Sequence, residues 1–341
     1  MKMVTIKEVA KISGLSVGTV SNVINGLETV SETNKKKVQE VIDRLGFKPS
    51  RIASSLSSKK TGNMGIIVPD VSSPFYSEMI KGISETLEIN GLNIFLSGSN
   101  DNLDKETSLI KNMMYSWVDG LIIVPVYERE NEPGILNELK IPVVLVNREI
   151  RGVKRDLVVF NNFKGAYNAT AYLIKNNHKK IIILSGPKHS RSFEDRVIGF
   201  KEAMEEKGLY DGSLVFSCKY SEKSGYGAMH KALGKLQNID AVFASSDLIA
   251  LGAIAAIRER GLEIPGDISI VGFGDIYLSK YLNPPLTTIK RPFYNTGKTA
   301  VSLLLERISQ QRKFSDFKSE PARIIMQDLL EVRKSVKVKS V

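Results

Sequence analysis

The sequence predicts an α/β protein with a small helical N-terminal domain followed by two doubly wound parallel-sheet subdomains. Three observations favour this fold class. The first 47 residues contain three short stretches with apolar side chains at helical spacing, separated by glycines. From residue 63 onwards, short apolar runs alternate with helical stretches, which is typical of parallel strands covered on both faces. The chain has 341 residues, enough for two or three domains.

The first two helices are expected within residues 5–25, TIKEVAKISGLSVGTVSNVIN. Thr5 and Glu8 have the spacing of a capping box, in which each side chain satisfies the other residue's backbone N–H. Gly14 supplies a turn, and Ser16 caps the second helix. Apolar residues recur at helical spacing in the first helix at Ile6, Val9, Ala10 and Ile12, and in the second at Val20, Val23 and Ile24.

The other face of the second helix carries small and hydroxyl side chains, at Val17, Gly18, Thr19, Ser21 and Asn22. Such side chains can lie against phosphates and base edges in a major groove. Two helices this short are unstable alone and must pack on another element. The pattern therefore predicts a DNA-binding helix-turn-helix, although taken alone it also fits an ordinary helical hairpin.

A third helix is expected after Ser31, which caps it, and Gly46 ends it. Its apolar positions are Val38, Val41, Ile42 and Leu45. Together the three helices make a headpiece of residues 1–47. Residues 48–62 are serine-rich after Pro49 and form an interdomain linker with few anchors for a stable isolated helix.

Eight apolar runs predict the strands of the core: MGIIVP, NIFLSG, GLIIVP, PVVLVN, LVVFN, IIILSG, AVFASS and ISIVGFG. These are too many for one sheet, and the helices resume at about residue 161. We expect one subdomain from residues 63–160 with 290–320, and a second from residues 161–289 with 321–332. Ligands of such sheets bind outside the carboxyl ends of the strands, so the loops there should line a cleft between the subdomains.

The positive charge lies mainly at the N-terminal end. Residues 1–60 hold 11 Lys and Arg against 5 Asp and Glu, out of a net charge of +11 for the chain. A basic head on a near-neutral body suits a protein whose head alone meets a polyanion. The last residues, 333–341, hold four basic side chains and no acid, and we expect a solvated, partly disordered end.

Composition also predicts the compartment. No stretch is long and apolar enough to span a bilayer, and the start MKMVTIKEVAK has no apolar region of a signal peptide. The single cysteine, Cys218, fits a reducing environment. We therefore expect a cytoplasmic protein with no membrane partner.

The head and several core segments resemble the LacI/GalR family of transcriptional regulators. The similarity covers roughly residues 4–332 and rests on VTIKEVAKISGLSVGTVSNVIN, VSETNKKKVQEVIDRLGFKPSRIASSL, GIIVPDVSSPFYSEMIKGI, VDGLIIVP, ISIVGFGD and LTTIKRP. The resemblance implies a periplasmic-binding-protein-like core and a dimeric repressor on a palindromic operator. It also implies a linker that becomes a hinge helix on DNA, with Leu56 wedged between base pairs of the minor groove. The alternative for Leu56 is a linker residue that rests on the core.

The expected DNA-binding residues are Thr5, Ser16, Val17, Gly18, Thr19, Ser21, Asn22, Asn25, Ser31, Ser50, Arg51, Ala53 and Leu56. Some depart from the family pattern. Members commonly have arginine where Asn22 stands, and arginine favours guanine whereas asparagine pairs with adenine. We therefore predict an operator half-site that differs from the common family operator near Asn22. A tyrosine is usual at Phe47 and an asparagine at Ser50, so two polar backbone contacts are expected to be lost.

Nothing in the sequence indicates catalysis. His178, His189 and His230 are far apart and share no metal-ligand spacing with Cys218. No nucleophile-elbow or phosphate-loop motif is present. We therefore expect no enzymatic activity, no metal site and no cofactor.

Polar and aromatic side chains after the predicted strands indicate a small-molecule effector site. The expected residues are Asp70, Ser73, Phe75, Asn147, Arg148, Phe160, Ser192, Arg196, Ser246 and Asp275. Arginines, carboxylates and aromatic faces together can bind a polyhydroxylated ligand. Arg196 is the best candidate because it matches the family arginine that grips sugar hydroxyls or an effector carboxylate. Any one of these residues could instead be a loop polar group or a helix cap, as Ser192 and Asp247 illustrate.

The pocket also departs from that of many sugar-responsive members. These have an aspartate where this chain has Asn147, an asparagine or similar amide donor at Ser246 and an acidic residue at Gly274. Loss of these acceptors beside Arg148 and Arg196 predicts a sugar acid or sugar phosphate rather than a neutral sugar. Two alternatives remain open. A phosphocarrier-type protein partner could control the same DNA function from the outer face of the core. A solute-binding protein or sugar-handling enzyme on the same core would need an export signal or a catalytic cluster.

Overall fold

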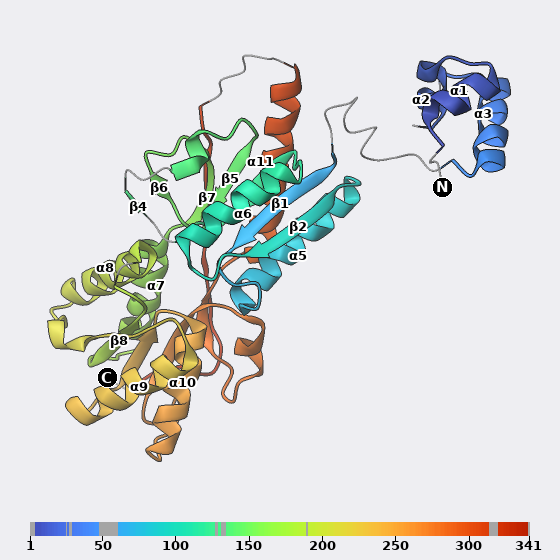
Figure 1. Ribbon diagram of the computed structural model, residues 1–341. Coiled ribbons are helices and arrows are strands. Elements are labelled where there is room, and N and C mark those ends of the chain that lie inside the picture. The colour runs from blue at the N-terminus through green and yellow to red at the C-terminus, as the bar shows by residue number, and fades with distance from the viewer. Residues whose placement is uncertain are drawn as a thin grey trace. The chain divides into compact units, whose positions relative to one another are not determined.

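The computed structural model describes residues 4–24, 26, 29–47, 61–126, 129–130, 134–188, 190–313 and 320–339. The chain divides into two compact units, residues 1–62 and residues 63–341 (Figure 1). Several predicted site residues lie outside the described residues, namely Asn25, Ser50, Arg51, Ala53 and Leu56, and so do His189 and residues 48–60 of the linker.

The N-terminal unit is a three-helix headpiece. Its helices are α1 (Ile6–Ser13), α2 (Val17–Ile24) and α3 (Glu32–Leu45). Each helix contributes one completely buried valine to the centre, at Val9, Val20 and Val38, and Phe47 closes the core with 8% of its surface exposed. The headpiece confirms the predicted helical N-terminal domain.

The predicted caps set the ends of α1 and the start of α2. The backbone N–H of Thr5 donates to Glu8 Oε2 at 2.7 Å, and the backbone N–H of Glu8 donates to Thr5 Oγ1 at 3.4 Å. Gly14 ends α1 with a φ of 70°, in the left-handed region that glycine tolerates. The backbone N–H of Thr19 donates to Ser16 Oγ at 3.0 Å, so α2 is capped as expected.

One local prediction is wrong. Ser31 precedes α3 with extended backbone angles, but its side chain makes no capping hydrogen bond. Among the apolar residues of α1, Ile12 is 46% exposed. It lies to one side of the stripe that Ile6, Val9 and Ala10 form along α1, and so it misses the small headpiece core.

The second unit contains two six-stranded sheets. In spatial order, the first sheet consists of β13 (Arg323–Met326), β7 (Asp156–Phe160), β5 (Val143–Val146), β3 (Gly120–Ile123), β1 (Asn63–Val68) and β2 (Asn93–Gly98). All neighbouring strands are parallel, and Ile66 of β1 lies opposite Leu96 and Ile122. Helices α5 (Pro74–Ile89) and α11 (Phe293–Lys313) cover one face; α6 (Leu103–Tyr115) and the 3₁₀ helix η1 (Gly134–Asn137) cover the other.

The second sheet has the order β14 (Leu329–Glu331), β12 (Thr287–Lys290), β11 (Ser269–Gly274), β10 (Ala241–Ala244), β8 (Ile181–Ser185) and β9 (Val215–Ser217). Only β14 runs antiparallel to its neighbour among these described strands. Helix α7 (Asn162–Lys175) packs on α8 (Arg191–Glu205), and α9 (Glu222–Lys235) packs on α10 (Asp247–Glu259). The two sheets confirm the predicted pair of doubly wound subdomains.

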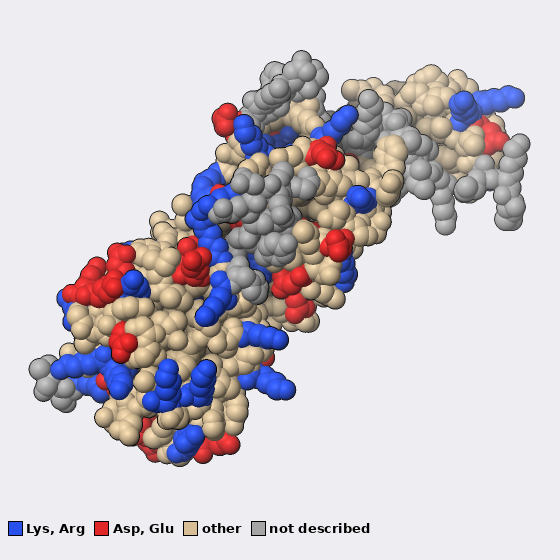
Figure 2. All heavy atoms as spheres, turned by 60° about the vertical axis from the view of Figure 1, so that its left-hand side comes forward, with Lys and Arg blue, Asp and Glu red and all other residues tan. Residues whose placement is uncertain are grey.

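Four short elements complete the description. They are the paired strands β4 (Arg129–Glu130) and β6 (Ile150–Arg151), and the 3₁₀ helices η2 (Gly212–Leu214) and η3 (Tyr277–Tyr281). No helix in the described ranges is long and apolar enough to cross a membrane. Basic and acidic side chains are both spread over the core on the face shown in Figure 2, as the near-neutral composition of the core predicts.

The chain crosses between the two sheets three times. The first crossing joins β7 to α7 at residues 160–162, and the second joins β12 to α11 at residues 291–292. The third joins β13 to β14 at residues 327–328. The assignment of residues 321–332 to the second subdomain is therefore wrong for β13, which pairs in parallel with β7 of the first sheet.

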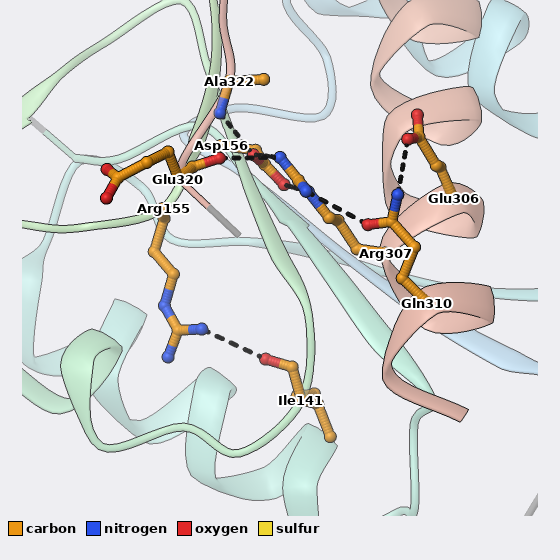
Figure 3. Close-up of polar contacts among 8 residues, drawn as sticks. All are labelled: Ile141, Arg155, Asp156, Glu306, Arg307, Gln310, Glu320 and Ala322. Carbon is orange, nitrogen blue, oxygen red and sulfur yellow. Dashed lines mark hydrogen bonds and ion pairs between the residues drawn. The ribbon is translucent and has the colours of Figure 1, made fainter. Parts of the chain in front are cut away.

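Figure 3 shows what holds the chain to the first sheet before β13. Arg307 of α11 donates from Nε and Nη2 to the two oxygens of Asp156, each at 2.8 Å. The backbone N–H of Ala322 donates to Asp156 Oδ1 at 2.8 Å, and Arg307 Nη2 also donates to the carbonyl of Glu320. Such a bidentate, charge-assisted pair is strong. It fixes α11 and the segment that enters β13 to the same strand.

The expected solvated C-terminal end is also wrong for residues 333–339. Ser335 is completely buried, and its Oγ accepts the backbone N–H of Thr287 at 2.8 Å and donates to the carbonyl of Ile270 at 2.6 Å. Lys339 Nζ lies 2.7 Å from Asp240 Oδ2. Arg333 and Lys339 thus find acceptors on the second subdomain, which composition alone does not reveal.

Candidate functional site

Helix α2 presents one face of the headpiece that carries no large side chain other than Val17. Val17 is 42% exposed and Gly18 is also exposed, while Val20 on the opposite side is completely buried. Thr19, Ser21 and Asn22 are half-buried. Ser16 Oγ lies 2.9 Å from Thr19 Oγ1, so both hydroxyls are held at the first turn of the helix. A short helix that docks through one face and leaves a small, polar face outside can enter a major groove.

A cavity of about 170 Å³ opens within the second unit, and loops of both subdomains line it. Six of the predicted effector residues lie on its walls: Phe75, Asn147, Arg148, Ser192, Arg196 and Ser246. Asp70 and Ser73 line a wider adjoining hollow that shares Tyr76, Asp101, Arg148, Pro187 and Tyr220 with the cavity. The cavity and the hollow thus form one continuous cleft.

Two predicted residues lie elsewhere. Phe160 packs edge-on against Phe293 and lies 4.1 Å under the guanidinium of Arg291, so it supports that side chain instead of lining the cavity. Asp275 forms an ion pair with Arg333 at 2.7 Å. That pair depends on the docked C-terminal segment, so it could not be expected for an end predicted to be solvated.

Arg196 is 5% exposed and rigidly held. Its Nε and Nη2 donate to Asn162 Oδ1 at 3.0 and 2.9 Å, and Nη1 donates to the carbonyl of Ser245 at 2.6 Å. The guanidinium lies 4.7 Å from the ring centre of Phe193 and 4.1 Å from that of Phe273. Planar stacking of this kind suits arginine and fixes its orientation.

Arg148 lies nearer the mouth of the cleft. Its Nη1 is 2.8 Å from Asp101 Oδ1 and donates to the carbonyls of Pro125 and Val126. The preceding residue, Asn147, has a φ of 67°, a left-handed conformation that asparagine adopts more easily than most residues. The chain therefore turns sharply at the end of β5 where Arg148 joins the wall.

Ser246, predicted as an effector residue, caps helix α10, whereas Asp247, named above as a possible cap, binds groups outside its own helix. Ser246 Oγ accepts the backbone N–H of Ile249 at 3.2 Å. Asp247 Oδ2 accepts the backbone N–H of Ile276 and the hydroxyl of Ser279, each at 2.9 Å, and Oδ1 accepts the hydroxyl of Thr288 at 2.7 Å. Burial raises the pKa of the Asp247 carboxyl, although these hydrogen bonds act to lower it. Asp247 therefore joins the loop that follows β11 to strand β12.

Other residues of the cavity wall were not predicted from sequence: Tyr76, Asp101, Phe193, Tyr220, Phe273 and Arg291. Arg291 directly follows β12, in the segment LTTIKRP. The rule that ligands sit beyond the carboxyl ends of strands could have found it, had that run been counted as a strand. Phe273 lies inside β11, where a buried core residue is the simpler expectation.

Comparisons with known proteins agree with this architecture. Residues 5–50 match the model of the bacterial regulatory proteins, lacI family, and residues 170–336 match the periplasmic binding protein-like domain. The chain is 33% identical to the HTH-type transcriptional regulator RegA of Clostridium saccharobutylicum, over 96% of this chain and 98% of that protein. The chain belongs to the LacI family.

Further relatives and solved structures of the family are similar over their full length. The HTH-type transcriptional repressor PurR of Pasteurella multocida is 35% identical, covering 98% of this chain and 99% of the relative. The Lac repressor dimer bound to operator and an anti-inducer is 26% identical with a TM-score of 0.84, covering 98% and 100% of the two chains. The regulator CelR in complex with cellobiose is 28% identical with a TM-score of 0.72, covering 97% and 99%. This family member is a DNA-binding transcriptional repressor and not an enzyme.

Proposed function

We propose that the protein binds a palindromic operator as a homodimer in the cytoplasm and that a small anionic carbohydrate in the cleft controls this binding. The observation that carries the proposal is the pairing of two features in one family member. One is the exposed small-residue face of α2 on a self-contained headpiece. The other is a cavity lined by loops from both core subdomains.

The DNA contacts that we propose are the residues of the α2 face, with the unusual Asn22 among them, together with Thr5, Ser31 and the linker residues predicted above. Asparagine can pair bidentately with adenine in the major groove. A dimer with two-fold symmetry requires a palindromic site, because each headpiece reads an equivalent half-site. The linker residues 48–62 connect this reading head to the core.

Exposed apolar surface on the core supports dimerisation. The edge strand β2 leaves Phe95 44% and Leu96 40% exposed, and η3 leaves Tyr277 61% and Tyr281 62% exposed. Unprotected edge strands and apolar patches on soluble domains commonly mark interaction surfaces. Because β2 belongs to the first sheet and η3 follows a strand of the second, a partner copy would contact both subdomains.

The cleft suits a small ligand, because its charged groups are buried where only a small molecule could reach them. Arg196 and Arg291 are 5% and 3% exposed. The cavity wall carries three arginines, Arg148, Arg196 and Arg291, against two carboxylates, Asp101 and Asp247. A ligand that fills the cavity would contact both subdomains and so bias their relative setting, which couples the cleft to the operator.

Selected-site enrichment with the full chain tests the DNA part. We expect a palindromic consensus with adenine opposite Asn22, and binding without sequence preference would contradict it. A thermal-shift panel of neutral sugars, sugar acids and sugar phosphates tests the effector part, because a ligand bound to the native state raises the melting temperature. Tightest binding by a neutral sugar would refute an anionic effector. No shift with any member would favour a protein co-regulator.

A further inference from the structure

The three chain crossings bring together one buried polar cluster at the wall of the cavity. Asn162 lies at the first crossing, Arg291 at the second and Asp328 at the third. Arg291 Nη2 donates to Asn162 Oδ1 at 2.6 Å, the same oxygen that accepts two N–H groups of Arg196. The two guanidinium groups also lie against one ring, since the distances from their carbons to the centre of Phe273 are 4.1 Å for Arg196 and 4.9 Å for Arg291.

Arg291 is less completely bonded than the other arginines of the cleft. Arg196 donates from all three of its nitrogens, and Arg148 donates to Asp101 and two carbonyls. By contrast, Nε and Nη1 of Arg291 have no hydrogen-bond partner among the residues that the structure describes. The side chain is nevertheless fully buried and lines the cavity. Buried donors of this kind are rare because the unmade hydrogen bonds are costly.

The nearest counter-ion of Arg291 is also poorly satisfied. Asp328 Oδ1 lies 3.7 Å from Arg291 Nε, too far for a hydrogen bond, and neither Asp328 oxygen has a hydrogen-bond partner within the described part of the chain. Burial raises the pKa of the Asp328 carboxyl, although the positive charges of Arg291 and Arg196 act to lower it. The carboxylate of Asp328 is thus the counter-ion of two guanidinium groups and makes a hydrogen bond to neither. Donors of Arg291 therefore remain for a second anion.

We infer that the guanidinium of Arg291 forms an anion subsite of the cleft for a carboxylate or phosphate group. Asp328 limits the affinity of this subsite, because its carboxylate is the nearest group with the same sign of charge as the bound anion. This inference deepens the proposed anionic effector and rests on it for the biological ligand. The subsite itself needs only an oxyanion small enough for the cavity, because charge-assisted hydrogen bonds from a guanidinium recognise carboxylate and phosphate alike.

Inorganic phosphate is the probe, with the full chain and with sodium chloride to hold the ionic strength constant. Isothermal titration should show phosphate binding to the natural protein and at least about tenfold weaker binding to Arg291→Gln, because a charge-assisted donor is lost. Asp328→Asn should bind phosphate about tenfold more tightly, because it removes a negative charge within a few ångströms of the bound anion. Lys201→Gln is the matched control, since it removes a charge from the half-exposed outer side of α8 and should bind phosphate as the natural protein does.

Removal of Arg291 alone leaves Asp328 without its counter-ion, so Arg291→Gln could fail to fold. The double variant Arg291→Gln, Asp328→Asn avoids this problem because it replaces an ion pair by two neutral amides, and it should still lose the phosphate response. Equal phosphate binding by the natural protein and either glutamine variant would overturn the subsite, and so would a natural protein that does not bind phosphate. A failure of the phosphate experiment can be told apart from a failure of the operator-selection experiment, because the latter tests only DNA binding by the headpiece.

Discussion

In the headpiece, Val17 is 42% exposed and the small side chains beside it project from a single helix that docks through Val20. In the cleft, Arg196 and Arg291 are 5% and 3% exposed and share one oxygen of Asn162, although the three residues come from different elements. The first surface can exchange its side chains one at a time, because each is exposed or only half-buried. The second cannot, because residues of one hydrogen-bonded network are energetically coupled. The comparison predicts large effects in the cleft and small ones on α2.

The largest effect is expected for Asn162→Leu. Asn162 is 7% exposed, and its Oδ1 is the common acceptor for Arg196 and Arg291. Its loss leaves two buried guanidinium groups with fewer partners, so the core should lose about 3–5 kcal/mol of unfolding free energy. Urea unfolding of the full chain measures this. Asn162→Asp is the control, since it keeps an acceptor and adds a negative charge opposite two cations. A loss below about 1 kcal/mol for the leucine variant would show that the arginines are not coupled through Asn162.

A second effect concerns Asp240, a half-buried carboxylate outside the cleft. Burial raises the pKa of the Asp240 carboxyl, but the nearby imidazole of His178 at 3.6 Å and hydrogen bonds from Lys339 and the backbone of Lys179 outweigh burial and hold the pKa well below its usual range. Because the folded pKa lies below the unfolded value of about 3.9, the stabilisation is complete above that pH and is lost as the pH falls towards the folded pKa.

Asp240→Asn should therefore lower the unfolding free energy at pH 7 by about 1.5–3 kcal/mol, the range for hydrogen bonds to charged groups. The difference from the natural protein should shrink as the pH falls below about 4. Denaturant unfolding at pH 7 and pH 3 gives both values. A difference that stays constant with pH would mean that the carboxylate charge does not hold the C-terminal segment.

On the α2 face we expect a change in specificity without a change in stability. Asn22→Arg should move the preferred base at its contact from adenine to guanine, with about 1–3 kcal/mol of discrimination for a good bidentate pair. Selected-site enrichment with both proteins measures the preference, and thermal unfolding checks that the headpiece is unaffected. If the natural protein already selects guanine there, Asn22 does not read that base.

Local signals were enough to predict the headpiece, and the strand runs predicted the two sheets. The capping box of Thr5 and Glu8 and the left-handed Gly14 each act within one turn, so the sequence carries them directly. Long-range polar contacts leave no such trace. The docking of Ser335 under β11 and the bond from Ala322 to Asp156 each join residues far apart in the chain, and both contradict the prediction. For the same reason Arg196 was predicted as a ligand residue, but its shared partner Asn162 was not.

The smallest effect on stability, and the only expected gain in stability, is predicted for Gly18→Ala. An added Cβ would meet Ser16 Oγ at 3.7 Å, an ordinary contact, and glycine costs a helix interior about 1 kcal/mol relative to alanine. The headpiece should therefore gain up to about 1 kcal/mol of unfolding free energy, measured by its own thermal transition. Gly14→Ala is the matched control: it also has open space around it, but its φ of 70° strains any Cβ, so it should destabilise. Loss of stability in both variants would mean that position 18 is constrained by more than space and that α2 is less independent than its exposed face indicates.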